Sequence, residues 1–229
     1  MKIVLYSGGQ LRSNHKLHQT VVSLARQKHG KKQLTLTYIP FCSENSSIFF
    51  HRAKRRFGAN GVKNFVCLNI DNHPSPAEIK KAFQSDIIYL AGGNTFYYLK
   101  HLRESGVLAH LKSFAKKGGV LAGLSAGGLI MSPTIASAAE EALFPDDNEV
   151  NMKPKDFKSL GLFNFEFSPH FDGRPNEVKA HIAYSKKTKY PVYAVADGSG
   201  VVIDGKKITI VGKASIFHRG KLLERIQNR

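Results

Sequence analysis

A serine flanked by glycines, lying between two apolar runs, constrains this chain more than any other feature. The pentapeptide Gly123-Leu124-Ser125-Ala126-Gly127 follows an apolar run that begins at Gly119, and a second apolar run continues to Met131. In such a G-x-S-x-G pattern a strand turns sharply into a helix, and the serine lies at the corner. Glycines on both sides let strand and helix approach closely, while the corner strains the serine backbone. The pattern therefore predicts a nucleophile elbow at Ser125.

The chain before this serine alternates between predicted strands and predicted helices. Strands are expected at Lys2–Tyr6, Gln33–Ile39, Asn64–Ile70, Asp86–Ala91 and directly before Ser125; helices are expected at 14–29, Ser46–Phe57, from Pro76, at Phe96–Ser105 and up to Lys117. This rhythm predicts an α/β fold with a mostly parallel central sheet and helices on both faces. Ligands of such folds gather at the carboxyl ends of the strands.

The rhythm changes after the elbow. Residues 133–162 form an acidic, turn-rich stretch, and a strand is expected at Phe163–Pro169, followed by a helix at Asn176–Lys187. A small antiparallel β region is expected at the C-terminal end, over Pro191–Ala196, Gly200–Asp204 and Lys207–Val211. Because the sequence contains no repeat, low-complexity segment or linker, we expect one domain over residues 1–229.

Composition limits the classes of function. The net charge of +17 permits weak, non-specific binding to nucleic acid, but the lysines and arginines are dispersed and accompany no nucleic-acid motif. No apolar run approaches the roughly 20 residues that cross a bilayer, and the first apolar run is too short for a signal peptide. Two cysteines form no disulfide framework and no C-x-x-C spacing. We therefore expect a cytoplasmic protein that needs neither membrane nor metal.

A serine hydroxyl becomes a good nucleophile only when a nearby base takes its proton, and a carboxylate usually orients that base. Of the ten histidines, His170 alone ends a predicted strand, at the edge of the sheet where ligands are expected. The other nine lie in predicted helices, in a loop or in the C-terminal hairpin. The residues themselves leave the orienting carboxylate open among Glu140, Glu141, Asp146 and Asp147.

A pair of glycines forms a second candidate element of the site. Gly92-Gly93-Asn94-Thr95 follows the buried strand at Asp86–Ala91. The Gly93 N–H, together with the Ala126 N–H, could stabilise an oxyanion, and Asn94 or Thr95 could cap the next helix. A tight turn that needs glycine only for steric reasons is the alternative, and the two interpretations are compatible.

These segments together resemble the peptidase E (aspartyl dipeptidase) family of serine peptidases. The matching segments, in the same order and spacing as in that family, are Ala91-Gly92-Gly93-Asn94-Thr95-Phe96, Gly123-Leu124-Ser125-Ala126-Gly127, Met131-Ser132-Pro133-Thr134-Ile135 and Ser168-Pro169-His170-Phe171. The likeness extends over most of the chain. It implies a fold like that of the class I glutamine amidotransferases, with a serine in place of their cysteine.

The resemblance also implies roles for individual residues. Ser125 corresponds to the nucleophile, His170 to the base, and Gly93 and Ala126 to the oxyanion donors. The family's acid corresponds to Glu140, where peptidase E has aspartate; Glu141 is the alternative.

Substrate binding is the point at which this chain departs from the family. Asn94 and Arg174 are candidate substrate-binding residues. Peptidase E itself uses an arginine after the histidine to hold an N-terminal aspartate, but here Val178 aligns near that position. Arg174 is a possible replacement, because its guanidinium could grip a carboxylate, although it could also be a surface residue.

The sequence thus predicts a cofactor-independent serine peptidase that cleaves the N-terminal peptide bond of dipeptides or short peptides. Three alternatives remain. The first is a cyanophycinase-like peptidase, acting on an aspartate–arginine polymer. The second is an α/β-hydrolase esterase, which has the same order of serine, acid and histidine. The third is a basic protein that binds nucleic acid or a partner and keeps a vestigial site.

Overall fold

The computed structural model describes residues 1–9, 12–29 and 33–228. Its strands are β1 (Lys2–Tyr6), β2 (Leu34–Ile39), β3 (Val62–Cys67), β4 (Ile87–Leu90), β5 (Val120–Leu124), β6 (Glu166–Ser168), β7 (Val192–Val195), β8 (Gly200–Asp204), β9 (Lys207–Val211), β10 (Lys213–His218) and β11 (Lys221–Gln227). Its α-helices are α1 (His15–His29), α2 (Ser46–Gly58), α3 (Pro76–Ala82), α4 (Thr95–Glu104), α5 (Val107–Lys116), α6 (Ala126–Met131) and α7 (Pro175–Lys187), with 3₁₀ turns at Arg12–Asn14, Ala136–Ala139 and Pro154–Asp156.

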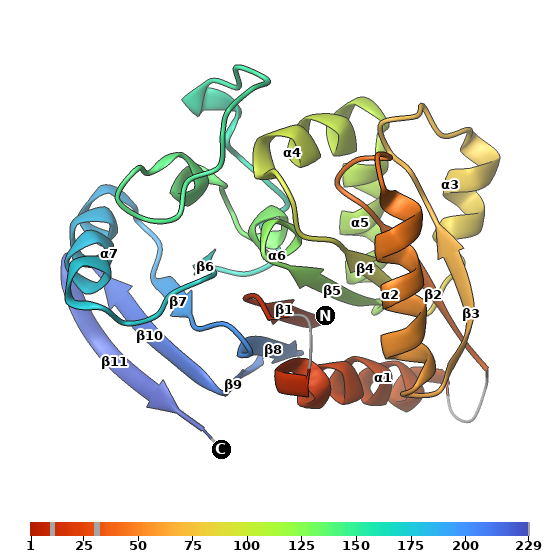
Figure 1. The fold of residues 1–229 in the computed structure, drawn as a ribbon, viewed down its shortest axis with the longest axis horizontal. Coiled ribbons are helices and arrows are strands. Elements are labelled where there is room, and N and C mark those ends of the chain that lie inside the picture. The colour runs from red at the N-terminus through yellow and green to blue at the C-terminus, as the bar shows by residue number, and fades with distance from the viewer. Residues whose placement is uncertain (10–11, 30–32, 229) are drawn as a thin grey trace.

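The central sheet has the strand order β3-β2-β4-β5-β1-β8-β9. The five strands from β3 to β1 run parallel, and β8 and β9 add antiparallel strands at one edge. Figure 1 shows this sheet crossing the molecule from β3 beside α3 toward a second sheet beside α7. The predicted α/β fold with a mostly parallel sheet is confirmed.

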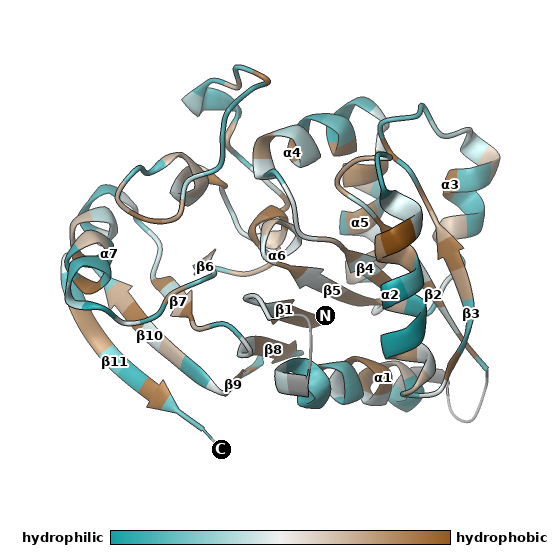
Figure 2. Ribbon diagram, in the orientation of Figure 1, coloured by the Kyte–Doolittle hydropathy of each residue, from teal (hydrophilic) through white to brown (hydrophobic). Residues whose placement is uncertain are grey.

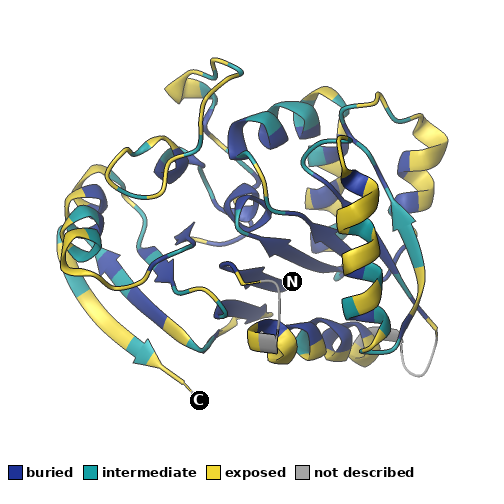
Figure 3. Cartoon of the chain, in the orientation of Figure 1, coloured by how far each residue is buried: buried dark blue, intermediate teal, exposed yellow. Residues whose placement is uncertain are grey.

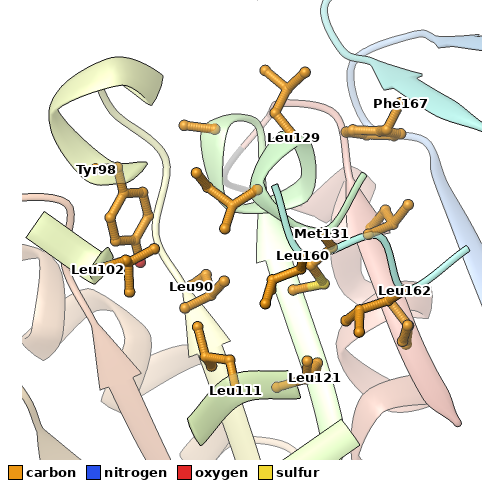
Figure 4. Packing of buried hydrophobic residues seen from close by; sticks show 14 of the residues in the cluster. Leu90, Tyr98, Leu102, Leu111, Leu121, Leu129, Met131, Leu160, Leu162 and Phe167 are labelled. Carbon is orange, nitrogen blue, oxygen red and sulfur yellow. The ribbon is translucent and has the colours of Figure 1, made fainter. Parts of the chain in front are cut away.

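Apolar side chains along the buried strands point alternately to the two faces of the sheet, so helices must cover both faces. In β1, Ile3 and Leu5 pack with the cluster beneath α3, α4, α5 and α6, whereas Val4 and Tyr6 pack with the cluster beneath α1 and α2. Figure 4 shows the first of these clusters, where Leu90 and Leu121 of the sheet meet side chains of the covering helices. Apolar colouring follows the central strands in Figure 2, and burial follows them in Figure 3.

The C-terminal β region is divided between two sheets. Two of its strands, β8 and β9, extend the central sheet, and β8 pairs with β1. The remaining strand, β7, lies in a four-stranded sheet of order β11-β10-β7-β6, which includes two strands beyond the predicted region. Strand β6 pairs with β7 in parallel, so the segments that follow these two strands leave the sheet at the same edge.

A local signal sets the start of α3 as expected. Ser75 Oγ accepts a hydrogen bond from the Glu78 N–H at 3.3 Å, and Glu78 Oε2 accepts one from the Ser75 N–H at 2.8 Å. This reciprocal pair is the capping box that the sequence predicts before Pro76. None of the helices among the described residues is both long and apolar enough to cross a membrane.

Candidate active site

Ser125 lies at a strained corner between β5 and α6. Its backbone has φ 49° and ψ −112°, a conformation that L-residues rarely adopt. The corner is held because the Ser125 N–H donates to the Tyr6 carbonyl oxygen at 2.9 Å. A Cβ at Gly123 would lie 2.5 Å from the Gly127 backbone, and one at Gly127 would lie 2.5 Å from the Leu90 oxygen. Only glycine allows this approach, as the elbow pattern predicts.

Three side chains form a continuous hydrogen-bonded chain at this corner. Ser125 Oγ lies 2.8 Å from His170 Nε2, and His170 Nδ1 lies 2.8 Å from Asp197 Oδ1. The histidine side chain is 24% exposed, whereas that of Asp197 is 56% exposed. The order hydroxyl, imidazole, carboxylate is the arrangement that activates a serine and orients its base. The structure thus brings the predicted pair Ser125 and His170 together.

The position of His170 is set by its backbone as well as by its ring. Its φ is 62°, in the left-handed region, and its N–H donates to Ser7 Oγ at 2.7 Å. The Ser7 hydroxyl lies 2.8 Å from the Val195 carbonyl oxygen and 3.1 Å from Asp197 Oδ1, and it can donate its proton to either. Ser7 therefore joins the turns after β1, β6 and β7 into one unit.

Close backbone packing holds Asp197 in place. A Cβ at Gly8 would lie 2.3 Å from Asp197 Oδ1, so the carboxylate occupies space that any other residue at position 8 would fill. Sequence reasoning missed Ser7, Gly8 and Asp197. A usable signal was present, because Ser7-Gly8-Gly9 and Asp197-Gly198 both follow predicted strands, where an α/β fold places its ligands.

Glu140 lies elsewhere, which corrects its expected place behind the histidine. Both of its carboxylate oxygens lie 2.9 Å from the Lys187 ammonium of α7. The hydrogen bond to His170 Nδ1 is made instead by Asp197. The physical reason is that β7 pairs with β6, so the turn after β7 meets the turn after β6. Glu141, the alternative, is an exposed residue of the following turn.

The other acidic candidates of this stretch bind the turn after β4. Asp146 Oδ2 accepts a hydrogen bond from the Thr95 N–H at 2.8 Å. The Asp147 carbonyl accepts one from Asn94 Nδ2 at 2.6 Å, while Asn94 Oδ1 caps α4 by accepting from the Tyr97 N–H at 2.9 Å. Asn94 thus serves as a helix cap and a loop contact; its role toward substrate stays a prediction.

The two predicted oxyanion donors come from two segments: Gly93 from the turn after β4, and Ala126 from the elbow itself. Gly93 has φ 148°, and a Cβ there would overlap the Phe41 ring, so the turn requires glycine. Ala126 is the first residue of α6 and is 1% exposed. Within the described part of the chain, neither N–H donates to a protein acceptor. A buried N–H group without a partner is rare, which marks that of Ala126 as a candidate for binding a ligand. Gly93 is exposed, so its N–H is open to solvent or to a ligand.

Arg174 is engaged by carboxylates of its own loop. Its guanidinium contacts Asp172 and lies 2.7 Å from Glu177 Oε1, and its side chain is 66% exposed. These neighbours raise the pKa of Arg174, with the Glu177 hydrogen bond contributing most. A substrate carboxylate would have to compete with both. The assignment of Arg174 to substrate binding therefore stays a prediction.

A small cavity of about 80 Å³ lies beside the elbow. Its walls include Gly92 and Leu124, the residues that precede the predicted oxyanion donor and the serine. The remaining walls are mainly aromatic and apolar, with two charged groups: Tyr38, Pro40, Phe41, Cys42, Glu44, Phe49, Arg56, Tyr89 and Ala91. Over the described ranges, no group of three or more His, Cys, Asp or Glu side chains is arranged to hold a metal ion.

Comparison with known proteins identifies the family of this chain. Residues 3–211 match the model of peptidase family S51. Peptidase E of Salmonella arizonae is 28% identical over 172 residues, which are 75% of this chain and 69% of that protein. Peptidase E of Citrobacter koseri is 27% identical over the same length.

Two solved structures share the fold. A peptidase from an acI-B1 actinobacterium superposes with a TM-score of 0.75 at 16% identity, covering 99% of this chain and 96% of that one. A protein of Listeria monocytogenes EGD-e, provisionally assigned to peptidase E, gives 0.68 at 23% identity, covering 91% and 96%. At these identities the likeness shows the fold alone.

Proposed function

This chain belongs to peptidase family S51, which makes it a serine-type peptidase, and on that premise we propose that it cleaves the N-terminal peptide bond of dipeptides or short peptides. The observation that carries the proposal is the hydrogen-bonded chain from Ser125 Oγ through His170 to Asp197 Oδ1. In this proposal Ser125 is the nucleophile, His170 is the base, and Asp197, in place of Glu140, is the orienting acid.

The reaction follows from this order of groups. Ser125 Oγ attacks the scissile carbonyl carbon and passes its proton to His170 Nε2. The C–N bond then breaks as His170 returns that proton to the departing amine, leaving an acyl-serine. A water molecule repeats the sequence: it gives a proton to His170, attacks the acyl carbon, and Ser125 leaves with the proton. Asp197 keeps the proton of Nδ1 in place and stabilises the imidazolium.

Two backbone donors complete the proposed mechanism. The N–H groups of Gly93 and Ala126 would bind the oxygen of the tetrahedral intermediate, because neither has a protein acceptor among the described residues. Ala126 belongs to the elbow, and Gly93 lies in the turn after β4, the strand that pairs with β5. Their backbones are fixed before substrate arrives, Gly93 by its close contact with Phe41 and Ala126 by the start of α6. Preorganised donors of this kind need no rearrangement when charge develops.

The feature that supports a short substrate is the segment from Glu140 to Asp147, hereafter the strap. One end is tied to α7 by the ion pair of Glu140 with Lys187, and the other is tied to the turn after β4 through Asp146 and Asp147. Because the strap spans the site between these two attachments, it walls one side. The aromatic cavity beside Gly92 and Leu124 is where we expect the side chain of the N-terminal residue.

The test is a dipeptide-library screen of the purified protein, with Ser125→Ala as the control. We expect hydrolysis of some dipeptides, covalent labelling of the wild type by a serine-directed phosphonate, and loss of both in the variant. Comparing Asp-X with neutral X-X dipeptides, in the wild type and in Arg174→Ala, tests whether Arg174 holds an N-terminal aspartate.

Two outcomes would contradict the proposal. Labelling that persists in Ser125→Ala would show that the reactive residue lies elsewhere. Degradation of an aspartate–arginine polymer without cleavage of any dipeptide would favour the cyanophycinase-like alternative.

A further inference from the structure

An exposed phenylalanine lies on the ring of the candidate base. Phe144 is 65% exposed, and its ring centroid lies 4.9 Å from that of His170, with an angle of 42° between the planes. Large apolar side chains cost free energy when they stay in water, and only a few of those in the described residues are exposed. The chemistry of the triad does not require an aromatic ring at this position.

The strap holds Phe144 in place from both sides. Leu143, the preceding residue, packs against the cluster of Phe171, Tyr184 and Phe217. On the other side, the Asp146 N–H donates to the Ala138 carbonyl at 2.9 Å, and its carboxylate accepts from Thr95. Because the chain is anchored one residue before and two residues after it, Phe144 has little freedom to leave the histidine. Its exposed face is therefore a fixed surface of the site.

The proton transfer from His170 shows which residue of the substrate would contact the exposed face of Phe144. His170 Nε2 must come within hydrogen-bond distance of the departing nitrogen to return the proton to it. This nitrogen belongs to the residue after the scissile bond. That residue therefore lies next to the imidazole, which the Phe144 ring contacts. An apolar side chain on that residue would cover the exposed ring and leave water, whereas a glycine or serine would gain little.

We propose that Phe144 determines specificity for the residue after the scissile bond and favours substrates in which that residue is apolar. The inference rests on the proposed function and deepens it. It also gives the strap a role. Between its attachments to α7 and to the turn after β4, the strap holds Phe144, which would contact the leaving residue of the substrate.

The experiment compares the wild type with Phe144→Ala and Phe144→Leu on a dipeptide series. The series keeps the best N-terminal residue from the library screen and places leucine, phenylalanine, glycine or serine second. In Phe144→Ala, kcat/KM should fall about tenfold for leucine and phenylalanine and less than about twofold for glycine and serine. Phe144→Leu should recover most of the loss. Leu223→Ala, which removes another exposed apolar side chain from the edge strand β11, should change none of these values.

A second measurement does not depend on turnover. Leucine amide resembles the departing residue, so it should slow phosphonate labelling of Ser125 in the wild type and do so less in Phe144→Ala, while glycine amide should have little effect on either. Equal loss of kcat/KM for all second residues would overturn the proposal, and so would equal protection by leucine amide in both proteins. Failure of the proposed function is distinct from these results, because it would show as labelling that survives in Ser125→Ala.

Discussion

The two halves of the candidate site are built in different ways. On the serine side, the strand, the glycines and the helix that hold Ser125 are neighbours in the chain. On the histidine side, His170 and Asp197 follow two strands of the second sheet, and Ser7 joins them from the first strand of the central sheet. The first half is a local structure; the second exists only when distant segments meet. A substitution in the backbone that supports Ser125 should therefore act mainly on folding, and one among the residues that position His170 mainly on catalytic geometry.

The largest effect should come from the acid on the histidine side. Asp197→Asn removes the negative charge at His170 Nδ1, and we expect kcat to fall about 10³- to 10⁴-fold. Glu140→Gln is the matched control: it breaks only a partly exposed ion pair with Lys187, worth about 1 kcal/mol or less. Steady-state kinetics on the best dipeptide measures both. The reverse order of effects would return the role of the acid to Glu140.

The serine side should respond in stability. Gly127→Ala places a Cβ 2.5 Å from the Leu90 backbone oxygen, which cannot move without disturbing β4, so the free energy of unfolding should fall by about 3 kcal/mol. Gly58→Ala at the end of α2 is the control, because its Cβ would meet no atom within 4 Å. Urea unfolding compares the two variants. Equal stability would mean that the elbow is looser than its contacts indicate.

The buried residue His18, which packs near the serine side of the site, should make the stability of the protein sensitive to acid. Burial, with a smaller effect from Arg56, lowers the pKa of His18 from 6.5 to about 4, and its ring packs against Tyr6, whose carbonyl binds the Ser125 N–H. Between those pH values the unfolded chain binds the extra proton and the folded chain does not. Stability should therefore fall, by up to about 3 kcal/mol, as the pH drops from about 6.5 toward 4.

His18→Gln provides the comparison for this pH dependence. Urea unfolding at pH 7 and at pH 4.5 should show a smaller difference in the variant than in the wild type, because glutamine does not titrate. The same difference in both proteins would assign the acid sensitivity to other groups.

The smallest effect should come from the serine that joins the three turns. Ser7→Ala removes the acceptor of the His170 N–H while leaving the triad side chains in place, so kcat should fall about tenfold, or about 1.4 kcal/mol in activation free energy. Ser105 lies at the C-terminal end of α4, where its hydroxyl donates to the His101 carbonyl. Ser105→Ala removes this hydroxyl and should leave kcat unchanged. A loss of stability without a change in kcat would make Ser7 a purely structural link.

The correct predictions from the sequence rested on signals that lie within a few residues of one another. The capping box at Ser75, the buried strand before Gly92 and the elbow at Ser125 depend on neighbours in the chain, and all were recognised. Glu140 was expected behind His170 because it was chosen by counting along an aligned motif, whereas the structure places Asp197 there. The pairing of β7 with β6 is hard to predict from the sequence, because the few residues of a short strand do not identify its neighbour in the sheet.

Sequence alone determined the serine, its strained corner and the parallel sheet that carries it, because close glycine packing and hydrophobic periodicity are local properties. Tertiary structure decided which carboxylate meets His170, because Asp197 and Ser7 are 190 residues apart and are brought together by strands in two sheets. The role of Glu140 likewise became visible only once α7 placed Lys187 beside it. The physical reason is that long-range pairing depends on the summed packing of whole elements, which no single motif encodes.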